Sequence, residues 1–210
     1  MKNLRSEVIK YAKMLNTRKL SALRSGNISA RYKEGFLITP SGAKYSSLKN
    51  KDIVFVSLKG EFDKKKGIPS SEWRFHQDIY KNKIDAKAIV HAHSNCATAI
   101  SAHGKKIPAF HYMVAMAGGN DIKCAKYATY GTRELSKNIL KTLRHRNACL
   151  IGNHGQIAFS ENLSKAFELA EEVENLSNQY IKALKIGNPK ILSSKKMNKV
   201  LSKAKNYKKG

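Results

Sequence analysis

Apolar residues recur three or four positions apart in several segments, the spacing of one face of an α-helix. This period predicts an amphipathic helix near the N-terminus, over residues 3–16, and a longer one over residues 163–184. Shorter helices are expected near residues 95–103 and over residues 133–145. The part of the chain with a regular hydrophobic pattern, residues 3–184, therefore begins and ends with a predicted helix.

Other segments are rich in β-branched residues or are bounded by turn residues, and these predict strands. The turn residues Ser25-Gly26-Asn27 and Pro40-Ser41-Gly42 enclose a hairpin. The predicted strands are 28–31, 35–39, 53–57, 87–93, 149–151 and 156–159. A further helix is expected to have Ser70 or Ser71 as its N-cap and to run through His76 and Tyr80.

Strands and helices alternate along the chain, and short connections join several of the strands. This order predicts an α/β fold with an antiparallel or mixed central sheet. The pattern stops after Ile186, where Gly187-Asn188-Pro189 ends the last helix. We expect residues 1–186 to form one domain. Residues 187–210 are Lys-rich with no acidic residue, so we expect a basic, mobile and solvated tail.

Composition narrows the class of protein. A chain of 210 residues with 41% hydrophobic residues suits one globular domain. Its apolar runs are too short to span a bilayer, and its N-terminus lacks the apolar core of a secretory signal. Its three cysteines are widely spaced, which argues against a disulfide framework. These features predict a cytoplasmic protein without a membrane partner.

The formal charge of +25, from 40 basic and 15 acidic residues, raises the hypothesis of nucleic-acid binding. However, the basic residues are scattered, and no helix-turn-helix, zinc-finger or RNP pattern accompanies them. A lysine-rich composition and the attraction of small anionic substrates explain the charge at least as well. Specific nucleic-acid binding is therefore the less favoured hypothesis.

Three histidines suggest a metal site. His91 and His93 are two residues apart in a predicted strand, so their side chains point the same way. His154, from the distant turn Gly152-Asn153-His154-Gly155, supplies a third nitrogen. Three protein ligands with one open position are typical of a catalytic zinc. The alternative is a set of ordinary histidines, because an isolated His-x-His pair is a weak signal.

Small polar residues in three turns suggest an anion site. Gly26-Asn27, Thr39-Pro40-Ser41-Gly42 and Pro69-Ser70-Ser71 each combine backbone N–H groups with a hydroxyl or amide. The serine pair also lies at an expected helix start, which favours an anion. Each turn alone has an ordinary structural explanation. Glu72, next in sequence, is either a common helix-start residue or a carboxylate beside the metal.

Taken together and in order, these motifs resemble those of the class II aldolase/adducin family. The resemblance covers about residues 25–160. The motifs that carry it are Ser25-Gly26-Asn27-Ile28-Ser29, Ile38-Thr39-Pro40-Ser41-Gly42, Pro69-Ser70-Ser71-Glu72, His91-Ala92-His93-Ser94, Pro108-Ala109-Phe110-His111-Tyr112-Met113 and Gly152-Asn153-His154-Gly155.

The resemblance implies a three-layer α/β/α fold with a mostly antiparallel sheet, in a fourfold-symmetric homotetramer with sites between subunits. It implies one zinc ion per subunit, held by His91, His93 and His154, with Glu72 as the resting fourth ligand and catalytic acid/base. Tyr112 matches a family tyrosine that reaches the neighbouring subunit's site, and its alternative is an interface or core aromatic residue. The implied phosphate-binding residues are Gly26, Asn27, Thr39, Ser41, Gly42, Ser70 and Ser71.

The implied activity is that of a carbon–carbon lyase. It cleaves a ketose 1-phosphate similar to L-fuculose 1-phosphate, reversibly, into dihydroxyacetone phosphate and an aldehyde. A methylthioribulose-1-phosphate dehydratase and a pentulose-phosphate 4-epimerase are alternatives on the same scaffold. A non-catalytic adducin-like assembly domain is less favoured, because all the metal ligands are present. His76, four residues after Glu72, is a candidate for supporting the metal ligands from the same helix face.

Overall fold

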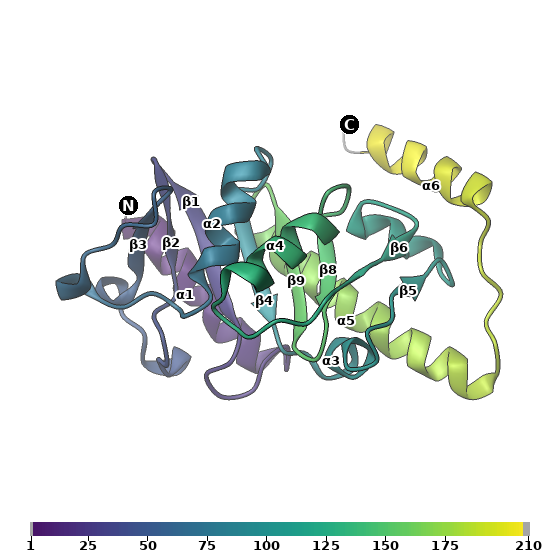
Figure 1. Ribbon diagram of the computed structural model, residues 1–210, viewed down its shortest axis with the longest axis horizontal. Helices are drawn as coiled ribbons and strands as arrows, with labels where there is room; N and C mark the ends of the chain where they lie inside the picture. Colours follow the sequence, from purple (N-terminus) through teal and green to yellow (C-terminus); the bar gives the residue numbers. More distant parts are fainter. Residues whose placement is uncertain (1, 208–210) are drawn as a thin grey trace.

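A seven-stranded sheet forms the centre of the protein in the computed structural model, which describes residues 2–207 (Figure 1). Neighbouring strands are antiparallel except β7 and β8, which are parallel. The strands lie in the order β3 (Val54–Ser57), β2 (Gly35–Ile38), β1 (Asn27–Tyr32), β4 (Ala88–Ala92), β9 (Gly155–Ser160), β8 (Ala148–Ile151) and β7 (Cys124–Ala125). A separate two-stranded ribbon pairs β5 (Ile107–Pro108) with β6 (Asp121–Ile122).

Helices cover both faces of this sheet, which confirms the three-layer α/β/α class and the mostly antiparallel sheet (Figure 1). On one face, α2 (Trp73–Asn82) and α4 (Arg133–Thr142) bury Phe75, Ile79, Leu135 and Ile139 against the strands. The opposite face packs against α1 (Lys2–Thr17), α3 (Asn95–Ser101) and α5 (Leu163–Ile186).

Strand β4 lies in the middle of the sheet and shows how the pleat positions a functional residue. Ala88 and Val90 face the core under α1 and α5, whereas Ile89 faces the core under α2. By the same alternation His91 faces α2, where its ring meets the edge of Phe75 at 5.3 Å between centroids. The antiparallel register also pairs His91 with Asn27 of β1.

The structure confirms the predicted helices and strands, with end residues shifted by a few positions. The expected N-cap at Ser70 or Ser71 is wrong, because α2 begins at Trp73 with Glu72 in the cap position. Backbone bonds explain the shift, since Ser70 N donates to Thr39 O and so ties this segment to the neighbouring loop. The two-residue strands β5, β6 and β7 and the 3₁₀ helices η1 (Tyr45–Ser47), η2 (Asn50–Asp52), η3 (Lys64–Lys66) and η4 (Tyr112–Ala117) were not predicted.

The lysine-rich C-terminal segment contains a helix where the sequence suggested a solvated tail. Helix α6 spans Ser194–Tyr207, and its Met197 is fully buried. With Met197, the partly buried Val200 and Leu201 form an apolar stripe at helical spacing that packs against the main core. The domain boundary after residue 186 stays a prediction, and residues 208–210 of the expected tail lie outside the described residues. Among the helices within residues 2–207, none combines the length and apolar composition needed to cross a membrane.

Candidate metal centre

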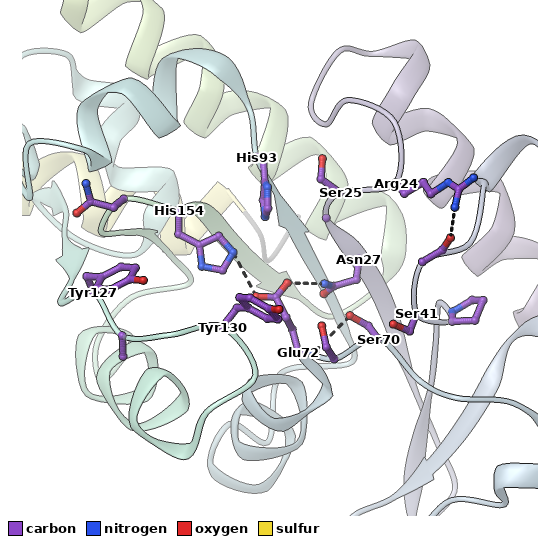
Figure 2. A pocket seen from close by; sticks show the side chains of 16 residues that line it. Arg24, Ser25, Asn27, Ser41, Ser70, Glu72, His93, Tyr127, Tyr130 and His154 are labelled. Atoms are coloured by element: carbon purple, nitrogen blue, oxygen red, sulfur yellow. Dashed lines mark hydrogen bonds and ion pairs between the residues drawn. The ribbon is translucent and has the colours of Figure 1, made fainter.

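Four side chains from separate parts of the chain converge at one end of the central strands. Figure 2 shows three of them, Glu72, His93 and His154. His91 lies on β4 and His93 just beyond its end, while Glu72 immediately precedes α2. His154 comes from the tight turn between β8 and β9, where its backbone N–H donates to Ile151 O. One potential ligand atom from each residue lies within 4.8 Å of all the others.

The imidazoles and the carboxylate are close enough to share one metal ion. Nε2 of His91 lies 2.9 Å from Nε2 of His93 and 3.2 Å from Oε2 of Glu72. The other carboxylate oxygen, Oε1, lies 3.2 Å from Nε2 of His154. Each pair of the three imidazole rings has its centroids 4.8 Å apart. The predicted ligands are therefore brought together around one point.

The surroundings of His91 place it in the form that binds a metal. Its Nδ1 lies 2.8 Å from the backbone carbonyl oxygen of Gln156, which is an acceptor only. Nδ1 must therefore carry the hydrogen, and in the neutral ring Nε2 keeps a lone pair facing the cluster. Burial, together with the neighbouring His91 and His154, lowers the pKa of His93 to about 3, so that ring is neutral at neutral pH.

The carboxylate also fits a bound cation. Glu72 is buried, and its Oε1 has no hydrogen-bond partner. Although burial alone raises its pKa, His91 and His154 hold the pKa of Glu72 well below its ordinary value. The same carboxylate lies 3.2 Å from Nε2 of His91 and 3.2 Å from Nε2 of His154. A divalent metal ion among these atoms would supply positive charge to the carboxylate and a partner for Oε1.

Gly26 lies in the turn before β1, and it allows this turn to lie close to β4, the strand that carries His91. Its φ is +76°, a left-handed value that favours glycine. A Cβ at this position would lie 2.7 Å from the backbone oxygen of His91 and 2.7 Å from Oγ of Ser21. The next residue, Asn27, donates from Nδ2 to Oε2 of Glu72 over 2.9 Å. The Gly26-Asn27 turn is therefore in direct contact with the metal cluster.

A cavity of about 370 Å³ opens beside the metal cluster, and Glu72, His93 and His154 are among its lining residues (Figure 2). It brings together most of the residues predicted to bind phosphate, namely Gly26, Asn27, Ser41, Gly42, Ser70 and Ser71. Thr39 does not line the cavity. Its buried Oγ1 instead accepts a hydrogen bond from Ile28 N, so the structure gives no support to Thr39 as a direct phosphate ligand.

Tyr112 is not one of the residues that line this chain's own cavity. It is the first residue of η4, and its side chain is 53% exposed. Conversely, the cavity is also lined by Arg24, Tyr127 and Tyr130, which the sequence did not single out. Of these, Arg24 directly precedes the Ser25-Gly26-Asn27 motif, which was the one available signal. The two tyrosines lie in a segment without regular secondary structure, where periodicity gives no information.

Comparison with known proteins places this geometry in a family. The sequence model of the Class II Aldolase and Adducin N-terminal domain matches residues 6–181, most of the chain. The chain belongs to this family. The family assignment agrees with the resemblance of the motifs and with the observed fold. Class II aldolases are metal-dependent carbon–carbon lyases, so this member is an enzyme of that class, and its Glu72-His91-His93-His154 cluster is placed so that it could hold the metal ion.

Individual family members are similar over nearly their whole length. The chain is 47% identical over 204 residues to a 5-methylthioribulose-1-phosphate/5-deoxyribulose-1-phosphate aldolase of Rhodospirillum rubrum, covering 97% of this chain and 92% of that protein. It is 48% identical over 184 residues to the L-fuculose phosphate aldolase of Escherichia coli K12, covering 87% and 85%. A solved L-fuculose 1-phosphate aldolase superposes with a TM-score of 0.94 at 38% identity, covering 98% of this chain and 97% of that one.

Proposed function

We propose that the protein is a zinc-dependent aldolase that cleaves a ketose 1-phosphate, reversibly, into dihydroxyacetone phosphate and an aldehyde. The observation that supports this most directly is the position of the metal cluster. Of the three imidazoles and one carboxylate in the cluster, His93, His154 and Glu72 line a cavity whose other polar lining suits a phosphate. Three nitrogen ligands and one displaceable carboxylate suit zinc with an open substrate position.

His91, His93 and His154 would hold the zinc ion, with Glu72 as the fourth ligand before substrate binds. When bound, zinc supplies a Lewis acid that draws charge from the C2 carbonyl of the ketose and so stabilises the carbanion left at C3. Within this arrangement Glu72 has the proton-transfer role. Once substrate takes its place at the metal, the carboxylate would take up a proton and deliver it to C3 after the C3–C4 bond breaks, which balances the proton lost from the C4 hydroxyl. In the synthetic direction the carboxylate would remove that proton from C3.

The phosphate of the substrate would bind in the same cavity, beside the metal cluster. Gly26, Ser41, Gly42 and Ser71 present backbone N–H groups or hydroxyls there, close to the N-terminus of α2. Arg24 adds a guanidinium to this otherwise uncharged set, and its Nη1 donates to Gly42 O over 3.1 Å. Anchoring the phosphate fixes the reacting carbons relative to Glu72, which turns binding into orientation.

Tyr112 would act in the cavity of a neighbouring copy of the chain. This proposal comes from the resemblance of the Tyr112 motif to that of the family, and it is supported by the exposure of Tyr112 and by its absence from the lining of its own cavity. In a homotetramer with sites between subunits, Tyr112 of the partner subunit would assist loss of the C4 hydroxyl proton during cleavage. Mixing Tyr112→Phe subunits with Glu72→Gln subunits tests this. Activity that returns on mixing supports shared sites, and activity that stays absent argues against them.

The aldehyde part of the substrate is best identified by experiment, because relatives named for different substrates are about equally similar to this chain. The zinc-loaded protein would be incubated with the 1-phosphates of fuculose, rhamnulose, ribulose, 5-deoxyribulose and methylthioribulose while dihydroxyacetone phosphate is measured. Release from one or more of them is the expected result. Loss of water from methylthioribulose 1-phosphate without release would favour the dehydratase, and epimerised product would favour the 4-epimerase. The cytoplasmic location and the absence of specific nucleic-acid binding stay predictions.

A further inference from the structure

A chain of buried polar side chains runs from Glu72 into the core between α2 and the sheet. It consists of Glu72, Asn27, His76, Ser29 and Tyr80, and every member is buried. Asn27 and Ser29 come from β1, whereas His76 and Tyr80 come from α2. Buried polar groups are costly unless they are paired, and each of these groups is paired with the next.

The hydrogen bonds of this chain have one consistent direction. Glu72 accepts from Nδ2 of Asn27 over 2.9 Å, so Oδ1 of Asn27 faces the other way and contacts Nε2 of His76. Because Oδ1 is an acceptor, Nε2 of His76 must carry the hydrogen. A neutral imidazole has one N–H, so Nδ1 of His76 is left as an acceptor.

The far end of the chain completes the same pattern. Nδ1 of His76 lies 2.7 Å from Oγ of Ser29, which therefore donates to it. Oγ of Ser29 also lies 2.7 Å from the hydroxyl of Tyr80. Burial raises the pKa of Tyr80, so its phenol keeps its proton and donates it to Ser29. Every hydrogen bond in the chain is therefore donated in the same direction: Tyr80 donates to Ser29, Ser29 to His76, His76 to Asn27 and Asn27 to Glu72.

Packing holds the imidazole of His76 in this position. The ring is fully buried and stacks on Phe75, with centroids 4.8 Å apart and an interplanar angle of 23°. Phe36 stacks at a centroid distance of 6.4 Å. The ring therefore has little freedom to turn. If Asn27 rotated its amide by half a turn, Oδ1 would face the carboxylate and Nδ2 would face the Nε2 hydrogen, and both contacts would be repulsive.

We infer that His76 is a positioning residue for Glu72, acting through the Asn27 amide as an oriented, uncharged hydrogen-bond donor. The amide fixes Oε2 of Glu72, which leaves Oε1, without a hydrogen-bond partner, as the oxygen free to move between metal and substrate. This role rests on the proton-transfer role proposed above for Glu72. It assigns a function to a histidine that ligates no metal and lines no part of the cavity.

The first test determines which ring nitrogen of His76 carries the hydrogen, and it needs no activity measurement. Two-bond ¹H–¹⁵N NMR correlations of the histidine rings distinguish Nε2–H from Nδ1–H, and a His76→Gln sample identifies the His76 signals. At neutral pH we expect His76 to be neutral with its hydrogen on Nε2, in both metal-free and zinc-loaded protein. A hydrogen on Nδ1, or a protonated ring, would overturn the inference.

The second test uses two substitutions of similar size. In His76→Gln the amide nitrogen takes the place of Nε2 and still donates to Asn27, whereas His76→Leu removes the donor. For the leucine variant we expect a zinc affinity about tenfold weaker and a kcat about 10- to 100-fold lower, with KM within about threefold. The glutamine variant should stay within about threefold of the parent in all three. Equal behaviour of the two variants, whether both normal or both impaired, would overturn the positioning role.

Ser29→Ala provides a second variant should the leucine variant fail to fold. Removing the hydroxyl that donates to Nδ1 frees the ring to exchange its hydrogen, so NMR should detect a mixture of tautomers and kcat should fall several-fold. Zinc affinity and tautomer are read without substrate. A parent protein that cleaves none of the sugars would therefore contradict the proposed function alone, while these two measurements still decide the role of His76.

Discussion

Oε1 of Glu72 lies 3.2 Å from Nε2 of His154, while Oε2 of the same carboxylate accepts a hydrogen bond from Asn27. The two oxygens therefore have different environments. Each oxygen lies 3.2 Å from an imidazole nitrogen of the metal cluster, but only Oε2 also accepts a hydrogen bond from an amide, that of Asn27. This asymmetry is what a residue needs if it is to bind a metal at rest and exchange a proton with substrate afterwards.

Replacing Glu72 by glutamine should remove proton transfer while leaving the three imidazole ligands in place. We expect kcat for cleavage to fall by about 10²- to 10⁴-fold, the usual contribution of a general acid or base, with KM little changed. Steady-state kinetics together with zinc analysis measures both effects. Glu134→Gln, at an exposed position of α4, is the matched control. Turnover in Glu72→Gln within tenfold of the parent would remove Glu72 from its proposed role.

Gly26 and Gly104 form a matched pair for testing the close approach to His91. Both have left-handed φ, +76° and +61°, so alanine strains the backbone at either position. A Cβ at Gly26 meets His91 O and Ser21 Oγ at 2.7 Å, whereas a Cβ at Gly104 meets nothing within 4 Å. We expect Gly104→Ala to lower the free energy of unfolding by about 1 kcal/mol. Gly26→Ala should lower it by clearly more and weaken zinc binding. Equal losses in urea unfolding would contradict this account.

Replacing Ser71 by alanine tests whether this part of the cavity binds the phosphate of the substrate. Ser71 lines the cavity and is exposed, so its replacement by alanine should leave the free energy of unfolding nearly unchanged. A lost hydrogen bond to a charged phosphate is worth about 1.5–3 kcal/mol. We therefore expect kcat/KM for a ketose 1-phosphate to fall at least about tenfold, while that for the unphosphorylated sugar stays the same. Equal losses for both sugars would show that Ser71 does not contact the phosphate.

The stability of the metal-free protein should depend on pH through His76. Burial lowers the pKa of His76 to about 3 from an ordinary value of 6.5. Between these values the unfolded chain binds a proton that the folded chain does not, so the free energy of unfolding decreases as pH falls below 6.5. The slope for one such group is at most about 1.4 kcal/mol per pH unit. Urea unfolding between pH 4.5 and 7.5 should show a shallower decrease in His76→Gln, and identical slopes would contradict the assignment.

The sequence predicted that the three histidines of the metal cluster would converge, because the signals for their positions are local. Two-residue periodicity places His91 and His93 on one side of a strand, and a glycine-flanked turn exposes His154. The contact between Asn27 and Glu72 depends on the pairing of β1 with β4, and strand register is not visible in a single sequence. Likewise, Tyr127 and Tyr130 line the cavity because of the course of an irregular segment, and no periodic pattern in the sequence predicts that course. In α6, one apolar stripe beginning at Met197 outweighed the lysine-rich composition.

The most direct measurement of the central claim is a zinc titration of metal-stripped protein during cleavage of L-fuculose 1-phosphate and the other ketose 1-phosphates. We predict no release of dihydroxyacetone phosphate without metal. Release should then rise in proportion to added zinc and level off at one ion per chain, with one aldehyde formed for each dihydroxyacetone phosphate. Cleavage that persists in fully stripped protein, or zinc binding at one ion per chain without cleavage of any of these sugars, would contradict the account.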